Sequence, residues 1–279
     1  MKVGVIGSGT MGAGIAQLFA QNGHEVVMNA RRETSIERGI SSIDKQFTRA
    51  VQREKMTGED KDACLARISG TTILDELKDC ELIIEAAAEE IESKKELFKK
   101  LDELLDENVI LASNTSSLSI TEIASATNRP HKVVGMHFFN PVPVMKLVEV
   151  IGGVATDDAT LDFVTDLAQQ LGKTAVRVDE APGFVVNRIL IPMINEGISI
   201  LADGVASAAD IDAAMKLGAN HPMGPLELGD LVGLDVCLDI MDVLYSEFQD
   251  PKYRAHPLLR KMVRGGKLGR KTKAGFYQY

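Results

Sequence analysis

The chain has no tryptophan and few aromatic side chains, which make up 5% of its 279 residues. An aliphatic core is therefore expected. There are only three cysteines, and their odd number and wide spacing fit neither a disulfide framework nor a zinc site. We expect Cys64, Cys80 and Cys237 to be reduced thiols in a cytoplasmic protein that holds no metal ion.

Basic residues are scarcer than acidic ones, since 31 Lys and Arg against 40 Asp and Glu give a formal net charge of -9. An acidic balance argues against nucleic acid or an anionic membrane surface as the main partner. We find no apolar run near the roughly 18 residues of a membrane span and no pattern of a secretory signal. The composition, 45% hydrophobic and 25% charged, is typical of an ordinary globular protein.

The first part of the chain alternates short β-branched segments with helical patterns. Strands are predicted at 3–6, 24–28, 68–72, 82–86, 109–112, 133–138, 146–150 and 174–178, and helices at 11–21, 94–105 and 158–171. A charged amphipathic stretch at 33–67 is long for one crossover between strands. The alternation predicts an α/β fold with a doubly wound, mostly parallel sheet of the Rossmann type.

The pattern changes after Ala181-Pro182-Gly183, where Pro and Gly together mark a break. From Phe184 to Met262 the periodicity is helical. We therefore predict a Rossmann-type domain over 1–182 and a smaller all-α domain over 183–279. The helix at 189–201 is more apolar than a solvent-facing helix, and a subunit interface would explain part of this.

A glycine-rich turn follows the first strand and opens a helix, in the order Gly7, Ser8, Gly9, Thr10, Met11 and Gly12. Gly7 would form the tight turn, Gly9 would let the backbone approach a pyrophosphate, and Gly12 would allow close packing of helix and strand. The helix N-terminus offers free N–H groups to the phosphates. The strand–turn–helix context favours dinucleotide binding over a plain tight turn.

The end of the second strand bears on which dinucleotide is bound. Folds that prefer NAD usually carry Asp or Glu about 20 residues past the glycine turn. The matching residue here is Ala30, followed by Arg31 and Arg32. A guanidinium binds a 2′-phosphate, so we expect NADP in preference to NAD. NAD remains the alternative cofactor if the two arginines only begin a solvated helix and Asn29 binds the ribose 2′-hydroxyl. It also remains the alternative if the side chain of Glu33 extends back to that hydroxyl.

Polar groups near strand ends are candidates for chemistry. His137 ends the segment 133–138, and Glu149 lies inside the next strand, where a charge needs a partner. A carboxylate can fix the tautomer of an imidazole, which then acts as a general acid–base. A histidine at a strand end is nevertheless more often structural when it stands alone.

Two further candidates follow strand ends. Asn114-Thr115-Ser116-Ser117 comes after the strand 109–112, and we expect one of its hydroxyls to cap the next helix. Glu89 comes just past the strand 82–86. It is either a cofactor contact or a solvated acid at a helix start, stabilised by the helix dipole. His24, His131, His221 and His256 are expected to be surface or loop residues.

Several segments resemble the L-3-hydroxyacyl-CoA dehydrogenase family, namely 5–12, 112–118, 135–141, 182–188 and 220–225. The His-Phe-Phe-Asn-Pro and Pro-Gly-Phe-Val-Val-Asn-Arg motifs within them are specific to that family. The resemblance implies hydride transfer between a nicotinamide dinucleotide and a 3-hydroxyacyl-CoA. It also implies a helical domain used for homodimerisation, and 3-hydroxybutyryl-CoA and acetoacetyl-CoA as the substrate pair.

The resemblance also implies roles for individual residues. His137 matches the general acid–base, and Glu149 matches its paired carboxylate. Ser116 matches the hydroxyl that holds the substrate oxygen, and Asn187 matches the amide that positions the acyl group.

Further residues match the cofactor pocket. The resemblance places Glu89 and Lys94 near the nicotinamide ribose, with Asn114 and Asn140 in the same pocket. Either asparagine is equally explained as a loop residue bonded to its own backbone.

The charged stretch at 33–67 contains candidate residues for binding the phosphates of CoA. Its cations, among them Arg49, Arg53 and Lys55, would hold phosphates that an acidic protein binds only through local positive charge. We expect Arg49 and Lys55 to serve this purpose, although a solvated helix face explains them equally well.

Two other functions remain open at this point. One is a non-enzymatic dinucleotide-binding protein on the same fold, and the other is a dehydrogenase for another hydroxy acid, such as a sugar acid. The presence of His137, Glu149, Ser116 and Asn187 argues against the first. The His-Phe-Phe-Asn-Pro motif argues against the second.

Overall fold

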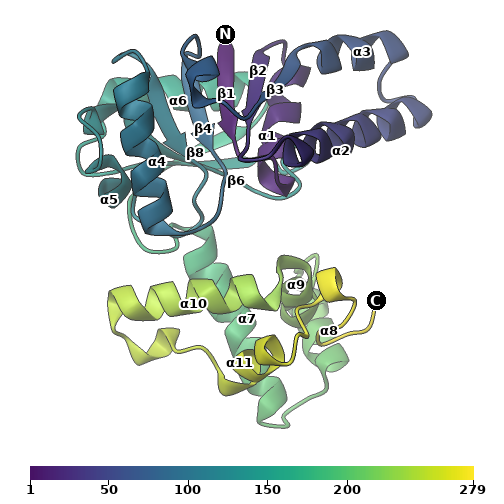
Figure 1. The fold of residues 1–279 in the computed structure, drawn as a ribbon. Coiled ribbons are helices and arrows are strands. Elements are labelled where there is room, and N and C mark those ends of the chain that lie inside the picture. The colour runs from purple at the N-terminus through teal and green to yellow at the C-terminus, as the bar shows by residue number, and fades with distance from the viewer. The chain divides into compact units, whose positions relative to one another are not determined.

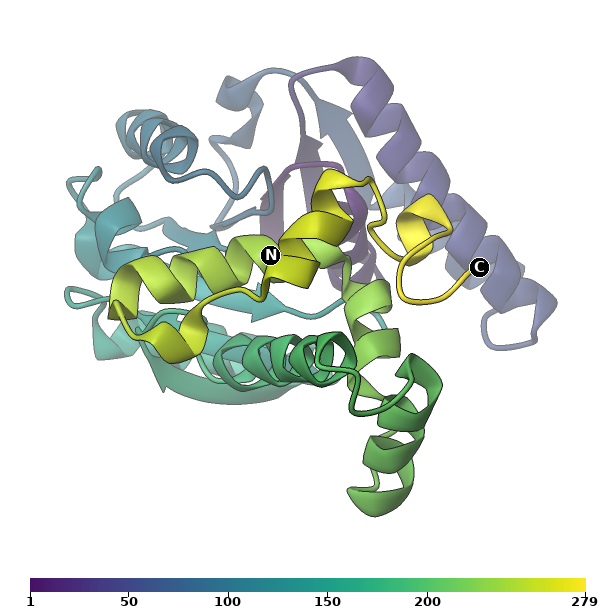
Figure 2. The ribbon, with the colours of Figure 1, turned by 90° about the horizontal axis from the view of Figure 1, so that it is seen from below.

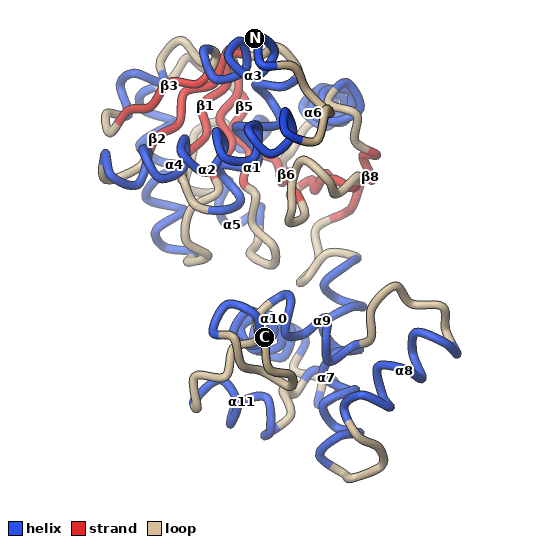
Figure 3. The backbone as a smooth tube through the Cα atoms, turned by 90° about the vertical axis from the view of Figure 1, so that its right-hand side faces the viewer, coloured by secondary structure: helices blue, strands red, loops and turns tan.

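The computed structural model describes all 279 residues. They form two compact units, Met1–Glu180 and Ala181–Tyr279. All strands of the sheet belong to the first unit, whereas the second is built from helices and loops (Figure 3). None of the helices is both long enough and apolar enough to span a membrane.

The first unit is organised by an eight-stranded sheet with the order β3-β2-β1-β4-β5-β6-β7-β8. Neighbouring strands are parallel except β6 and β7, which are antiparallel. This confirms the doubly wound, mostly parallel sheet predicted from the sequence. The strands are β1 (Lys2–Ile6), β2 (Glu25–Asn29), β3 (Ile68–Thr71), β4 (Leu82–Glu85), β5 (Ile110–Ser113), β6 (Val133–Phe138), β7 (Leu147–Gly152) and β8 (Thr174–Asp179).

Helices cover both faces of this sheet, with α4 and α6 on opposite sides in Figure 1. The aliphatic residues of α1 and α6 join those of the strands in one buried cluster, as the scarcity of aromatics requires. The charged stretch folds as α2 and α3, joined by a short turn. The elements are α1 (Thr10–Gln21), α2 (Glu33–Gln52), α3 (Gly58–Ala66), η1 (Leu74–Leu77), α4 (Ile91–Leu104), α5 (Ile120–Ala124), η2 (Pro130–Lys132) and α6 (Asp158–Gln170).

The sheet order reverses between β1 and β4, because the chain builds outward from β1 in one direction and from β4 in the other. The register places Asn29, Ile6, Glu85 and Ser113 side by side at the carboxyl ends of β2, β1, β4 and β5. Open α/β sheets bind ligands outside the carboxyl ends at such a reversal. The fold therefore predicts a ligand site at the carboxyl ends of β1 and β4, where Ile6 and Glu85 lie.

The second unit packs its helices around a separate aliphatic core that includes Ile194, Ile198, Met241 and Leu244. Within it α10 contacts α7 and α11, and Figures 1 and 2 show the unit from two sides. Its elements are α7 (Val186–Ala202), α8 (Ala208–Gly218), α9 (Pro225–Val232), α10 (Leu234–Phe248), η3 (Pro251–Tyr253), α11 (Pro257–Arg264) and η4 (Arg270–Thr272).

All three cysteines are buried free thiols. Burial raises the pKa of the Cys80 thiol to about 11 and that of Cys237 to about 12. Both thiols are therefore protonated and unreactive at neutral pH.

Candidate active site

The glycine-rich turn lies between β1 and α1, and glycine is needed at its positions for different physical reasons. Gly7 has a φ of +107°, and a Cβ there would lie 2.4 Å from the carbonyl oxygen of Ala86. A Cβ at Gly12 would lie 1.8 Å from the carbonyl oxygen of Gly7. The protein's own packing therefore requires glycine at both positions.

Gly9 is different, because no other part of the protein lies within 4 Å of the place where its Cβ would be. The fold itself does not require glycine there. A bare backbone beside a helix N-terminus is what the close approach of a pyrophosphate needs. The turn thus fits a dinucleotide.

A cavity of about 510 Å³ opens beside this turn at the reversal of the sheet. The predicted cofactor residues among its lining are Gly7, Ser8, Ala30, Arg31 and Lys94. Ser8, Gly9 and Thr10 line a neighbouring cavity of about 440 Å³, which Arg38 of α2 also borders. Met11 and Gly12 lie within α1, and Arg32 is an exposed residue just before α2.

His137 and Glu149 face each other across the antiparallel pair β6 and β7. The Nδ1 atom of His137 lies 2.7 Å from Oε2 of Glu149. Both side chains are buried, with 6% and 1% of their surface exposed. The structure thus gives Glu149 the partner that a charge inside a strand requires. The ring of Phe139 packs against the imidazole, with 4.4 Å between their centroids.

Glu89 and Ser116 are also brought together. Oε1 of Glu89 accepts hydrogen bonds from the Thr115 hydroxyl at 2.6 Å and from the backbone N–H of Ser116 at 2.7 Å. The Ser116 hydroxyl donates to the same oxygen at 3.1 Å. The carboxylate of Glu89 therefore holds the loop that follows β5, with Ser116 on it.

This geometry corrects the expectation about a helix cap. The cap of α5 is Ser119, which accepts from the N–H of Glu122, and no hydroxyl of 114–117 caps that helix. The predicted cap was wrong because the contact with Glu89 occupies the preceding loop and the helix begins later. The cap of α4 is Glu90, whose carboxylate accepts from the N–H groups of Glu92 and Ser93.

Glu85 was missed in the sequence. It is fully buried at the end of β4, and Lys94 is 2% exposed. Nζ of Lys94 donates to both carboxylate oxygens of Glu85, at 2.6 Å and 2.7 Å. The Ser113 hydroxyl donates to Oε2 at 2.7 Å. The available signal was an acidic residue at the end of the apolar segment 82–84, which needs a buried partner.

The two predicted asparagines are placed differently. The side-chain oxygen of Asn114 accepts from the backbone N–H of Phe138 at 2.9 Å, which ties the end of β5 to the end of β6. Asn140 is exposed and precedes a cis bond to Pro141. Lys173 fixes the rest of that loop, since its Nζ donates to the carbonyls of Val142 and Met145 at 2.6 Å and 2.8 Å.

The remaining predicted residues lie away from these contacts. Arg49 and Lys55 are exposed near the end of α2 and in the turn before α3. Asn187 is a buried residue of the second unit, at the start of α7. Of the other histidines, His256 caps α11 through its ring nitrogen.

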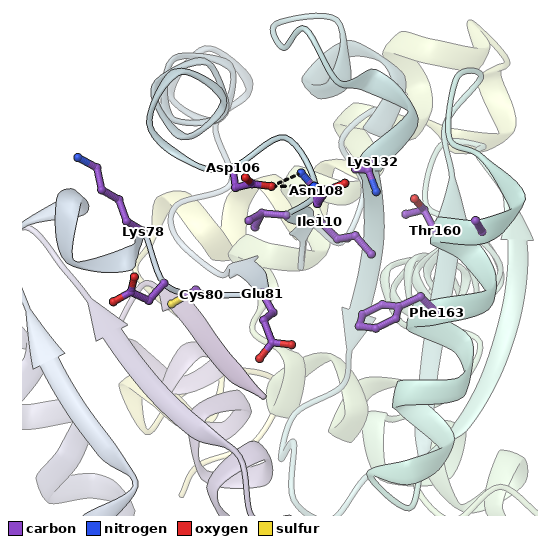
Figure 4. A pocket seen from close by; sticks show the side chains of 12 residues that line it. Lys78, Cys80, Glu81, Asp106, Asn108, Ile110, Lys132, Thr160 and Phe163 are labelled. Atoms are coloured by element: carbon purple, nitrogen blue, oxygen red, sulfur yellow. Dashed lines mark hydrogen bonds between the residues drawn. The ribbon is translucent and has the colours of Figure 1, made fainter.

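A further cavity, of about 530 Å³, opens at the opposite edge of the sheet (Figure 4). It is lined by residues that precede strands, including Cys80, Asn108 and Lys132, and by Phe163 of α6. No predicted site residue borders it. This cavity is therefore separate from the candidate site.

Comparison with known proteins matches both parts of the chain to one family. Residues 2–181 match the model of the 3-hydroxyacyl-CoA dehydrogenase NAD-binding domain, and residues 183–279 match that of its C-terminal domain. The chain belongs to the 3-hydroxyacyl-CoA dehydrogenase family. The resemblance recognised in the sequence is thereby confirmed.

Relatives within this family match the chain over its whole length. It is 61% identical to 3-hydroxybutyryl-CoA dehydrogenase of Clostridioides difficile, covering 100% of this chain and 99% of the relative. A crystal structure of (S)-3-hydroxybutyryl-CoA dehydrogenase from Ralstonia eutropha has a TM-score of 0.95 at 51% identity, covering 100% and 98% of the two chains. FadB2 of Mycobacterium tuberculosis has a TM-score of 0.97 at 44% identity, covering 99% and 98%.

Proposed function

We propose that this protein is an NAD(P)-dependent oxidoreductase that interconverts 3-hydroxybutyryl-CoA and acetoacetyl-CoA. The observation that carries the proposal is the buried contact between His137 and Glu149. It lies in a sheet whose carboxyl edge also bears a dinucleotide turn. The relatives from Clostridioides difficile and Ralstonia eutropha bear the name of this activity.

The proton chemistry follows from that contact. Glu149 fixes the imidazole through Nδ1, so the opposite ring nitrogen, Nε2, exchanges the proton with the substrate oxygen. In oxidation, neutral His137 takes the proton of the 3-hydroxyl. In reduction, the imidazolium returns a proton to the forming alkoxide, and the carboxylate of Glu149 stabilises that imidazolium. A dinucleotide held at the glycine-rich turn would supply or accept the hydride at C3.

The other residues serve to position the substrate. Ser116 holds the substrate oxygen near the imidazole, and the contact of its loop with Glu89 fixes where that hydroxyl lies. Asn187 positions the acyl group, and Arg49 and Lys55 hold the CoA phosphates. Each of these assignments takes support from the family motif in which the residue stands or from its charge.

NADP is the preferred cofactor in this proposal. Ala30 and Arg31 line the cavity beside the glycine turn, at the place where NAD-binding folds carry an acid. The side-chain amide of Asn29 donates to the carbonyl of Thr71 at 3.1 Å within the sheet. That contact favours the arginines over Asn29 as the group that recognises the 2′ position.

We also propose a cytoplasmic homodimer formed through the helical unit. Ile189 of α7 supports it, since 68% of this apolar side chain is exposed. A contiguous exposed apolar surface is typical of subunit contacts, and α7 is predominantly apolar.

The proposed activity is tested by adding acetoacetyl-CoA to the enzyme with NADPH or NADH and following the absorbance of the reduced cofactor. Consumption of the cofactor is the expected result, and parallel assays with longer 3-ketoacyl-CoA substrates measure the chain-length range. A folded protein that binds the dinucleotide but consumes none with any 3-ketoacyl-CoA would favour the non-enzymatic alternative. Turnover of a CoA-free hydroxy acid, with none of any 3-ketoacyl-CoA, would favour the alternative of a dehydrogenase for another hydroxy acid.

A further inference from the structure

Glu85 lies where the strand order reverses, in register with Ile6 on one side and Ser113 on the other. No part of its side chain is exposed to solvent. Oε1 accepts from Lys94 and from the backbone N–H of Ala87, both at 2.6 Å, and Oε2 accepts from Lys94 and Ser113, both at 2.7 Å. Three donor groups thus make four hydrogen bonds to this carboxylate and fix its position.

Stability alone is a weak reason for such a pair. Burying two charges removes them from water, and apolar residues of similar volume often stabilise a protein as well or better. A buried carboxylate and ammonium at the reversal of the sheet therefore call for a second explanation. Both residues line the cavity beside the glycine turn, and a role in that cavity is such an explanation.

The pair continues toward the reacting groups. Nζ of Lys94 also lies 3.5 Å from Oε2 of Glu89, whose other oxygen holds the loop of Ser116. Contacts thus run from Glu85 through Lys94 and Glu89 to Ser116. Glu85 is the buried end of this series, and its position is fixed by the sheet itself.

We infer that Glu85 is a positioning residue for the dinucleotide. It holds the Lys94 ammonium rigidly in the cofactor cavity, so that a polar oxygen of the dinucleotide meets a donor already in place. Preorganised donors bind more tightly because no side-chain ordering is required on binding. The inference rests on the proposed function, of which it names one further part.

The experiment measures binding of NADPH and NADH by their own fluorescence, which is convenient in a chain without tryptophan. The variants are Glu85→Gln, which keeps the shape and removes the charge, Lys94→Met, and the two combined. Glu92→Gln is the matched control, because Glu92 is an exposed carboxylate on the same helix whose partner is Lys95. Melting temperature is recorded for each variant.

Glu85→Gln should raise the Kd of the preferred dinucleotide about tenfold, the effect of losing roughly 1.4 kcal/mol from a charge-assisted contact. Glu92→Gln should leave it unchanged. If Glu85 acts through Lys94, the combined variant should bind no more weakly than Lys94→Met alone. The combined variant buries no unpaired charge, so it serves as the reference should Lys94→Met fold poorly.

A purely structural role predicts other results. Glu85→Gln would then lower the melting temperature and leave the Kd unchanged, which would overturn the inference. The inference would also be overturned if, in the combined variant, the weakening of binding caused by Glu85→Gln added in full to the weakening caused by Lys94→Met. Because binding is measured without acyl-CoA, the outcome is independent of whether acetoacetyl-CoA proves to be the substrate.

Discussion

The imidazole of His137 and the carboxylate of Glu149 occupy opposite positions on adjacent antiparallel strands, with 2.7 Å between Nδ1 and Oε2. β6 and β7 form the antiparallel pair of an otherwise parallel sheet. Directly opposed residues on one face of such a pair have their side chains close together. The register therefore sets the contact, and a one-residue slip of it would move the two side chains to opposite faces.

Replacing Glu149 by Gln should separate binding from chemistry. The amide keeps the shape of the side chain but no longer stabilises an imidazolium. We expect the KM values to stay near native while kcat falls by roughly 10²-fold or more. Near-native turnover in Glu149→Gln would remove the carboxylate from the proposed mechanism.

Cofactor preference is tested at the end of β2. The native enzyme should show a higher kcat/KM for NADPH than for NADH with acetoacetyl-CoA. A charge-assisted hydrogen bond contributes roughly 1.5–3 kcal/mol, so the preference should be about tenfold or greater. Ala30→Asp should reverse it, because the acid repels a 2′-phosphate and accepts from a 2′-hydroxyl.

The same assay identifies the cause of that preference. Arg31→Ala or Arg32→Ala should reduce it, and Arg31 is the arginine that lines the cavity. A native preference for NADH would contradict the NADP assignment. An NADPH preference that survives both substitutions would leave the assignment standing and remove the arginines as its reason.

The proposed binding of the CoA phosphates is tested by the double variant in which Arg49 and Lys55 are both replaced by alanine. The KM for acetoacetyl-CoA should rise with little change in kcat, because phosphates remote from the reacting carbon contribute uniform binding. The matched control is Lys78→Ala with Lys132→Ala, which removes the same charge at the opposite edge of the sheet. An unchanged KM, or an equal rise in the control, would assign Arg49 and Lys55 to a solvated helix face.

Arg129 should matter for stability and not for catalysis. Its buried guanidinium donates to Oδ1 of Asp102 at 2.7 Å and to the carbonyls of Asp102 and Leu105 at 2.7 Å and 2.8 Å, which closes the end of α4. Arg129→Met leaves these groups unpaired and should cost about 3–5 kcal/mol of unfolding free energy. Native KM values in the folded variant are expected, and an unchanged melting temperature would contradict the prediction.

The cost should depend on pH. Burial raises the pKa of Asp102, but hydrogen bonds from Asn128 and Arg129 outweigh it and hold the pKa below its ordinary value. The stability gained is fully present above the unfolded pKa of about 3.9 and is lost as the pH falls through the folded value. The difference between native protein and Arg129→Met should therefore shrink in acid-side unfolding measurements.

The strands and the site motifs followed from local patterns. Alternating segments predicted the sheet. A histidine and a glutamate on successive strands made positions 137 and 149 candidates, and the family resemblance assigned them as a pair. The contact between Glu85 and Lys94 was not predicted, since it depends on the tertiary placement of α4 over the reversal of the sheet. The cap at Ser119 was missed for a similar reason, because a contact with Glu89 sets the path of the preceding loop.

The most direct test of the proposed function is kcat for reduction of acetoacetyl-CoA by the native enzyme and by His137→Ala, measured with the preferred cofactor. Dinucleotide binding and melting temperature are recorded alongside to show that the variant is folded. Because general acid–base catalysis contributes about 10²–10⁴-fold, kcat should fall by that factor while the dinucleotide still binds. A folded His137→Ala enzyme with near-native turnover would contradict the assignment of His137 and the mechanism built on it.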